Sequence, residues 1–342
     1  MITIIKPGLL TTIQDKGRWG YQAYGMPVAG AMDRYAYNIA NFLVGNVCDA
    51  AVVEMTMLGA TLRFDNEAWV SICVADMQGT LNREKIRNWS SFYIAAGSEL
   101  AFGYVASGCR SYLAVRGGID VPLVLGSRST YTRAGVGGVD GKALHAGSTL
   151  AVGKQQTSVA GQLRTVPAAF IPHYASELTV RVLLGPQDDL FTEEGIATFF
   201  NSEYTISDEA DRMGYRLEGP PIKHSGTADI ISDALCQGAI QVPGHGMPIV
   251  MMADRGTTGG YAKIGTVIGP DLSWLAQAKP GDSVRFIQCF DEEAVAALQH
   301  EQDSYTQIET WVTAPQHKFI NARSFKVTIN EQCYDVEVEE VK

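Results

Sequence analysis

The 342-residue chain lacks the features of several large classes of protein. It has no surplus of positive charge, because 27 Lys and Arg stand against 37 Asp and Glu, so a nucleic-acid surface is not expected. No apolar run approaches the roughly 20 residues of a membrane span. Residues 1–8 have the pattern of a strand and a turn, without the regions of a signal peptide. We therefore expect a cytoplasmic protein that binds neither nucleic acid nor membrane.

Metal and redox motifs are also missing. The six cysteines are scattered and form no Cys-x-x-Cys pair, and the six histidines form neither His-x-His nor His-x-x-x-His. Zinc sites and thiol redox centres need such spacings. The cysteines are therefore interpreted as reduced and mostly buried, and no metal site is predicted.

The common nucleotide-binding motifs fail on inspection. The glycine-rich run over residues 135–143 has Val136 where a Walker loop needs its first glycine, and Ala143 where that loop needs Ser or Thr. The run fits no Gly-x-Gly-x-x-Gly register, and the chain has no Gly-x-Ser-x-Gly element. We interpret the run as a surface loop. If the protein uses ATP, a partner is expected to hold the nucleotide.

What the chain does contain is glycine and short apolar runs. There are 35 glycines, and 46% of the residues are hydrophobic, which is a globular composition. Strand signals, which are β-branched and aromatic runs bounded by glycine, occur for example at residues 69–74, 111–115 and 178–184. Helix is predicted only at residues 33–44, roughly 188–200 and roughly 291–301. The chain is predicted to be mainly β with a few short helices.

One ten-residue pattern occurs twice. The segments that begin at Arg18 and Arg212 share R-x-G-Y-x-x-x-G-x-P. Further matches follow in the same order, between residues 59–76 and 238–254 and between residues 96–102 and 280–286. A fixed large period indicates two copies of one domain. We expect a first domain over residues 1–160, a second over 170–290, and a C-terminal helix with a β-like tail over 291–342.

Polar residues gather in the turns between the apolar strands. Asp33 stands at the start of a helix, where both an N-cap and a functional acid are open readings. Arg18 and Arg212 occupy matching positions, so each has a structural ion pair, to Asp15 or Asp208, as an alternative to substrate binding. Residues 254–263 combine an acid, threonines, glycines and a lysine, which suits an anion site.

In combination, these clusters resemble the allophanate hydrolase subunit 2 family, also called KipA-like or the biotin-dependent carboxyltransferase family. The matching motifs lie at residues 11–22, 30–33, 117–122, 125–130, 211–217, 238–243 and 257–264. The resemblance implies two tandem cyclophilin-like β-barrels, which agrees with the repeat. It also implies a KipI-like partner, that is, a protein similar to allophanate hydrolase subunit 1.

Three functions follow from this resemblance. Free-standing bacterial members resemble the C component of 5-oxoprolinase, which acts with separate A and B components to open 5-oxo-L-proline to L-glutamate with ATP. Other relatives form the carboxyltransferase part of urea carboxylase. Others are non-catalytic antagonists of a histidine-kinase inhibitor. The expected substrate is a small amide or lactam.

The end of the chain bears on this choice. Residues 325–341 resemble the opening strands of a biotin carrier domain, and an ordinary hairpin around Asn330 and Glu331 is an equal alternative. No Ala/Met-Lys-Met biotinylation hairpin follows. We therefore expect biotin not to be attached to this chain, which favours the 5-oxoprolinase interpretation.

The polar clusters supply candidates for the chemistry. Carboxylates would move protons, and cations would stabilise charge on a lactam or carboxyl oxygen. Candidate catalytic residues are Asp15, Asp33, Arg128, Asp254 and Lys263. Candidate substrate-binding residues are Gln14, Arg18, Arg212, Gln241, Thr257, Thr258 and Tyr261.

Overall fold

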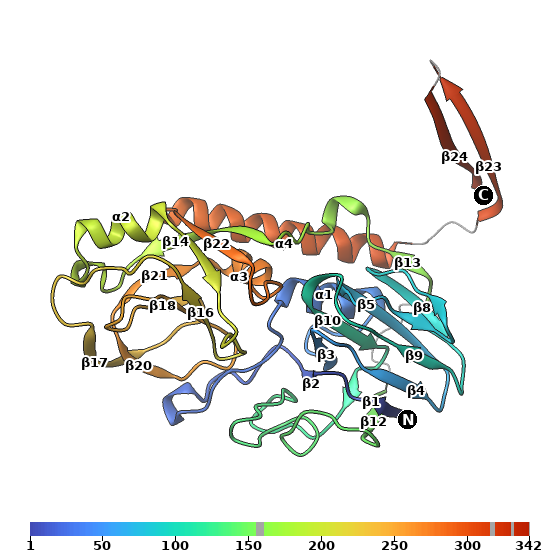
Figure 1. Cartoon of the computed structure of the whole chain (residues 1–342). Helices are drawn as coiled ribbons and strands as arrows, with labels where there is room; N and C mark the ends of the chain where they lie inside the picture. The colour runs from blue at the N-terminus through green and yellow to red at the C-terminus, as the bar shows by residue number, and fades with distance from the viewer. Residues whose placement is uncertain (155–160, 315–318, 330–331, 342) are drawn as a thin grey trace.

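The computed structural model describes residues 1–154, 161–314, 319–329 and 332–341, with side chains as far as residue 314. Figure 1 shows two β-rich halves side by side, with the long helix α4 (Asp291–Thr313) running along both. The first turns of α4 pack on the second half through Ala294, and its last turns pack on the first half through Ile308 and Val312. The helix therefore ties the two halves together.

The first half consists of two sheets that enclose one core. One sheet has the order β11 (Ile119–Asp120), β12 (Thr149–Val152), β1 (Ile2–Lys6), β4 (Thr61–Phe64), β9 (Glu99–Ala101), β6 (Thr80–Leu81), β7 (Glu84–Lys85). The other has the order β13 (Arg164–Thr165), β8 (Ser90–Ile94), β5 (Ala68–Asp76), β10 (Ser107–Val115), β3 (Val52–Thr56), β2 (Leu10–Gln14). Leu62 from the first sheet and Ile72 and Leu113 from the second belong to the core between them.

Strand alternation gives the second sheet two buried faces. Leu113 points into the core between the sheets, whereas its neighbours Tyr112 and Ala114 pack against helix α1 (Arg34–Leu43). The Ser71 hydroxyl donates to the carbonyl oxygen of Ala40 at 2.6 Å, which pins α1 to β5. Helix α1 therefore presents its N-terminus at a fixed place beside the second half.

The second half is a closed barrel. Its strands follow the order β14 (Glu177–Leu184), β21 (Lys263–Val267), β18 (Ala239–Gln241), β19 (Ile249–Met251), β16 (Gly214–Glu218), β15 (Glu203–Ile206), β22 (Ser283–Gln288). Helix α2 (Glu193–Asn201) places Phe199 on Phe286 with ring centroids 4.5 Å apart. Helix α3 (Gly269–Leu275) precedes β22, and β17 (Asp229–Ala234) with β20 (Thr258–Tyr261) forms a two-stranded arm.

Short 3₁₀ turns and a terminal hairpin complete the described residues. The turns are η1 (Gln22–Tyr24), η2 (Ala168–Phe170) and η3 (Asp188–Leu190). Strands β23 (Phe319–Ile329) and β24 (Gln332–Val341) pair antiparallel, with Ile329 opposite Gln332. The predicted turn residues Asn330 and Glu331 lie outside the described residues. No helix in the described ranges has the length and apolarity needed to cross a membrane.

The predicted fold class, mainly β with few helices, is confirmed. Of the two predicted barrels, the second half is a closed barrel, whereas the first half consists of two sheets around one core. Predicted helix 33–44 corresponds to α1, and predicted helix 291–301 extends to Thr313 in α4. The repeated decapeptide, however, differs between the halves: Gly20 and Tyr21 lie in a loop, whereas Gly214 and Tyr215 begin β16. That match therefore does not mark equivalent positions. The domain limits drawn from it stay predictions.

Candidate junction site

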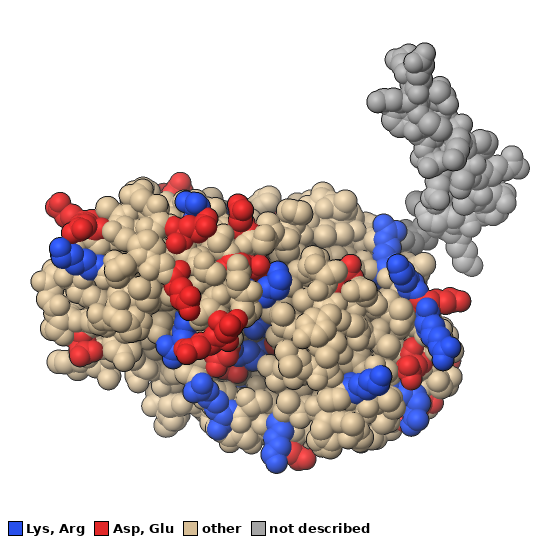
Figure 2. All heavy atoms as spheres, viewed as in Figure 1, with Lys and Arg blue, Asp and Glu red and all other residues tan. Residues whose placement is uncertain are grey.

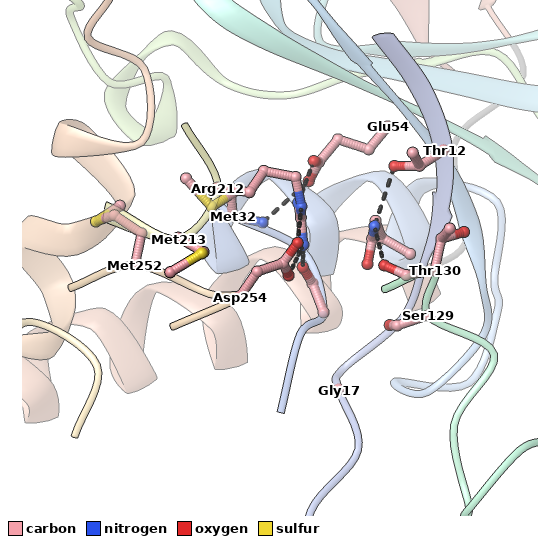
Figure 3. A network of polar contacts seen from close by, with 12 residues as sticks. Thr12, Gly17, Met32, Glu54, Ser129, Thr130, Arg212, Met213, Met252 and Asp254 are labelled. Carbon is pink, nitrogen blue, oxygen red and sulfur yellow. Dashed lines mark hydrogen bonds and ion pairs between the residues drawn. The ribbon is translucent and has the colours of Figure 1, made fainter. Parts of the chain in front are cut away.

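A buried ion-pair network joins the two halves around Arg212. This residue precedes β16, in a turn held by Asp211, whose carboxylate accepts from the N–H groups of Met213 and Gly214. Its guanidinium binds both oxygens of Asp254 at 2.8 and 3.0 Å. Figure 3 shows Arg212 between Asp254 and Glu54. The predicted pairing of Arg212 with Asp208 is wrong, because Asp254 and Glu54 take its donors.

The first half contributes two acceptors to this network. Glu54, on β3, forms an ion pair with Arg212 Nη1, and its other oxygen accepts from the Met32 N–H at 2.9 Å. Arg212 Nη2 also donates to the carbonyl oxygen of Gly30 at 2.7 Å. Both carboxylates of the network are buried, so removing Arg212 would leave each without the guanidinium that binds it. Arg212 therefore locks the halves in one arrangement.

Burial and pairing act against each other on these charges. Burial lowers the pKa of Arg212, but the carboxylates of Asp254 and Glu54 outweigh it, so the net shift of that pKa is upward. Burial raises the pKa of Asp254 above its ordinary value, and the neighbouring Arg212 opposes the shift. The N–H groups of Arg212 donate to acceptors within the protein, so we interpret Arg212 as a residue that orients Asp254.

Asp33 forms a second polar link across the junction. It is the N-cap of α1, where its carboxylate accepts from the Ala36 N–H at 3.0 Å. Its other oxygen accepts from Gln277 Nε2 of the second half at 2.9 Å. Complete burial raises the pKa of Asp33 to about 6, against hydrogen bonds from Ala36, Gln277 and Ser273 that favour the charged form. The N-cap reading is correct, and the raised pKa also keeps the functional reading open.

Gln277 and Arg110 extend this link, and sequence reasoning missed both. Gln277 Oε1 accepts from the N–H groups of Cys109 and Arg110 at 3.0 and 2.9 Å. The Arg110 guanidinium donates to the Tyr215 hydroxyl and to the Ala276 carbonyl oxygen, both at 2.5 Å. Glu54 was missed as well, although one acid inside the apolar run 51–55 is a signal of a paired buried charge.

Asp15 braces a loop of the first half. Its carboxylate accepts from the hydroxyls of Ser127 and Ser129 at 2.6 and 2.5 Å, and from the N–H groups of Gly17 and Arg128. Gln14 lies next to it and donates to Thr12 Oγ1 and to the Thr130 carbonyl oxygen. These hydrogen bonds occupy both carboxylate oxygens of Asp15, so in this structure Asp15 stabilises the loop 127–130.

Arg18 is fully buried beside the same loop. It donates to the carbonyl oxygens of Val124 and Ser129 at 2.9 and 2.8 Å, in place of the predicted ion pair with Asp15. Burial lowers the pKa of Arg18, against the charges of Asp15 and Asp254. The predicted loop 135–143 does form turns here, and Gly137 comes so close to Ser129 that a Cβ would lie 2.0 Å from its carbonyl oxygen.

The remaining candidates lie apart from the junction network. Arg128 faces Asp120 at 3.5 Å and lines a small polar cavity of the first half. Lys263 is buried in the barrel, where its ammonium group binds Asp233 of the β17–β20 arm at 2.8 Å. Gln241 donates to the Tyr261 carbonyl oxygen at 3.3 Å. Thr257, Thr258 and Tyr261, which lie on or beside β20, are half-buried or exposed.

The predicted residues thus separate into three groups. The junction contains Asp254, Arg212 and Asp33. The loop 127–130 is surrounded by Gln14, Asp15 and Arg18. The barrel and its arm contain Gln241, Lys263 and Tyr261. Figure 2 shows acidic and basic side chains gathered where the surface is hollowed between the halves. Within the described ranges, no group of three or more metal-ligating side chains occurs. The junction joins acids and a cation from both halves of the chain.

The fold and this junction define a class of protein. The chain belongs to the family described as "Carboxyltransferase domain, subdomain A and B", whose model matches residues 24–288. That range contains both halves of the junction, including Asp33, Glu54, Arg212 and Asp254.

Individual relatives carry two kinds of name. The chain is 36% identical over 308 residues to the C component of 5-oxoprolinase from Escherichia coli (strain K12), and the match covers 90% of this chain and 97% of that protein. It is 34% identical over 321 residues to urea amidolyase of Saccharomyces cerevisiae, covering 88% of this chain but 17% of that protein. The crystal structure of Kluyveromyces lactis urea carboxylase matches with a TM-score of 0.84 and 27% identity, over 100% of this chain and 32% of that one.

Proposed function

We propose that this chain is the C component of an ATP-dependent 5-oxoprolinase, which opens 5-oxo-L-proline to L-glutamate. The observation that carries the proposal is the near end-to-end match to a protein named as that component, 90% of one chain against 97% of the other. The urea amidolyase relative, in contrast, is matched over only 17% of its length. In this account the chain works in the cytoplasm, with a KipI-like partner and a protein similar to the A component of 5-oxoprolinase.

The proposed chemistry is addition of water to the lactam carbonyl and cleavage of its C–N bond. Water loses a proton as it attacks, and the departing nitrogen gains one, so the site needs a group that moves protons. Asp254 is oriented by Arg212, and burial brings its pKa closer to neutrality. Asp33 has a pKa of about 6 and can therefore exchange a proton near neutral pH. We assign proton transfer to Asp254, with Asp33 as a second acid.

The two cations among the candidates receive no role in this chemistry. Lys263 binds Asp233 and Arg128 faces Asp120, both apart from the junction where we place the lactam. Because the chain contains no nucleotide motif, ATP is assigned to the partner proteins.

Carboxyl transfer is the second candidate function. Two observations favour it: the family model is named for a carboxyltransferase domain, and the whole chain superimposes on part of a urea carboxylase. For that reaction we assign carboxybiotin, the carboxyl donor, to another protein. The same acids would serve that reaction, so the substrate distinguishes the two functions.

The experiment is a reconstitution with the KipI-like and A-component-like proteins, followed by measurement of L-glutamate formed from 5-oxo-L-proline and ATP. We expect turnover to require all three chains and to fall by at least 100-fold in Asp254→Asn. A matched control is Asp65→Asn, at an exposed acid that forms an ion pair with Arg63. A stable three-chain complex that forms no glutamate would contradict the proposal. Carboxybiotin and urea would then be the substrates to test.

A further inference from the structure

Arg255 is a buried cation without an acidic partner. It follows Asp254 directly, and only 6% of the residue is exposed. Its guanidinium donates to two carbonyl oxygens, Leu235 O from Nε at 3.1 Å and Met252 O from Nη1 at 3.4 Å. In the part of the chain that the structure describes, it forms no ion pair with a carboxylate. The adjacent Asp254 is already engaged by Arg212.

A second guanidinium reaches the same turn from the other half. Arg34, in the first turn of α1, donates from Nη2 to Gln237 Oε1 at 3.0 Å. Gln237 is two residues from Leu235, the acceptor of Arg255, so one short turn receives both arginines. The Arg34 guanidinium also lies 5.3 Å from the ring centroid of Trp19. The two cations are close enough for Arg34 to lower the pKa of Arg255. The charge of Glu301 acts on Arg34, but it is not among the groups that act on Arg255.

Like charges at one place are costly unless an anion joins them. Buried charges in proteins are normally paired, and a guanidinium does not relieve its burial by losing its proton at neutral pH. Burial is the main cause that lowers the pKa of Arg255 to about 10; Cys236 opposes this shift, and the nearby Arg34 adds to it. Planar guanidinium groups match the geometry of carboxylates. We infer that Arg34 and Arg255 bind a small carboxylate between them.

The inference rests on the proposed function for the identity of this carboxylate. The substrate 5-oxo-L-proline carries a carboxylate on a lactam ring, whereas urea carries none. Because Arg255 is the residue after Asp254, a carboxylate held by the arginine pair would keep the lactam near the acid that we assign to proton transfer. The Trp19 ring, half exposed beside Arg34, offers an apolar surface for the substrate ring. The pair would thus select an acidic lactam over a neutral amide.

The test measures binding to the full chain by isothermal titration calorimetry, with 5-oxo-L-proline and its neutral carboxamide as probes. We expect the acid to bind at least 10-fold more tightly than the carboxamide, and Arg255→Gln or Arg34→Gln to abolish this difference. The control Arg285→Gln, at an exposed arginine paired with Glu203, should leave the difference unchanged. Equal affinity for the two probes, absence of measurable binding of the acid, or a difference that survives both substitutions would overturn the inference.

A second measurement guards against misfolded variants and separates this inference from the proposed function. Thermal unfolding should show that Arg255→Gln folds, and that 5-oxo-L-proline or acetate raises the Tm of the wild-type chain but not of the variant. If the carboxylates bind as expected while the reconstituted complex forms no glutamate, the proposed function fails and the arginine site stands. If the complex forms glutamate with the same KM in the wild type and Arg255→Gln, the arginine site fails and the proposed function stands.

Discussion

Replacing Arg212 by methionine tests whether the ion-pair network holds the two halves together. The substitution keeps an unbranched apolar side chain but removes the guanidinium that binds Glu54 and Asp254. Only 1% of Glu54 and 5% of Asp254 are exposed to solvent. Breaking a buried pair by removing one partner costs about 3–5 kcal/mol. Two carboxylates lose their guanidinium partner here, so we expect the upper part of that range, about 4–5 kcal/mol.

Urea unfolding followed by circular dichroism measures this loss. The triple variant Arg212→Met, Glu54→Gln, Asp254→Asn removes the charges together, and we expect it to recover most of the stability, within about 2 kcal/mol of the wild type. Arg216→Met, at an exposed arginine that pairs with Glu209, is the matched control and should change the stability by less than about 1 kcal/mol. A loss below about 1 kcal/mol in Arg212→Met, or a triple variant no more stable than the single one, would refute the role of the network.

Three further predictions concern single positions. Asp33 has a folded-state pKa of about 6, above its ordinary value, so its contribution to stability is complete only below the unfolded-state pKa and is lost as the pH rises through 6. Relative to the wild type, Asp33→Asn should therefore gain about 2.4 kcal/mol between pH 4 and pH 7 in urea unfolding, and a constant difference would contradict this. Asp233→Asn removes the partner of Lys263, so amide hydrogen exchange should quicken in the β17–β20 arm and stay unchanged in β14; equal rates in the arm would show that the ion pair does not hold it. Gly137→Ala should cost at least about 2 kcal/mol more than Gly135→Ala, because both glycines have positive φ but only the Cβ at residue 137 would collide with the Ser129 carbonyl oxygen; similar Tm values for the two variants would contradict the close approach.

Much of the fold was predictable because its signals are local. The helix over residues 33–44 has an acidic N-cap and an apolar face, and the structure has α1 there with Asp33 as its cap. The run 111–115 alternates between the core and α1, as a strand buried on both faces requires. The repeated decapeptide misled, because a short pattern of Arg, Gly and Tyr suits both a loop and the start of a strand.

The site was predicted less completely because its contacts are long-range. Arg212 was recognised as a polar candidate, but its partner Glu54 lies 158 residues away in the sequence. Gln277 is 244 residues from Asp33, and nothing in its sequence neighbourhood distinguishes it from a surface glutamine. Lys263 was a good candidate by composition, yet the barrel directs it to Asp233 rather than to the junction. Spacing along the chain does not determine which turns meet when two halves pack together.

The most direct test of the central claim is detection of L-glutamate from 5-oxo-L-proline by the reconstituted complex with ATP. Glutamate is measured by chromatography after mixing this chain with its KipI-like and A-component-like partners, and in parallel with this chain or ATP omitted. The proposal predicts one glutamate for each 5-oxo-L-proline consumed in the complete mixture, and none in either omission. Glutamate formed at the same rate without this chain, or no glutamate from an assembled complex, would contradict it.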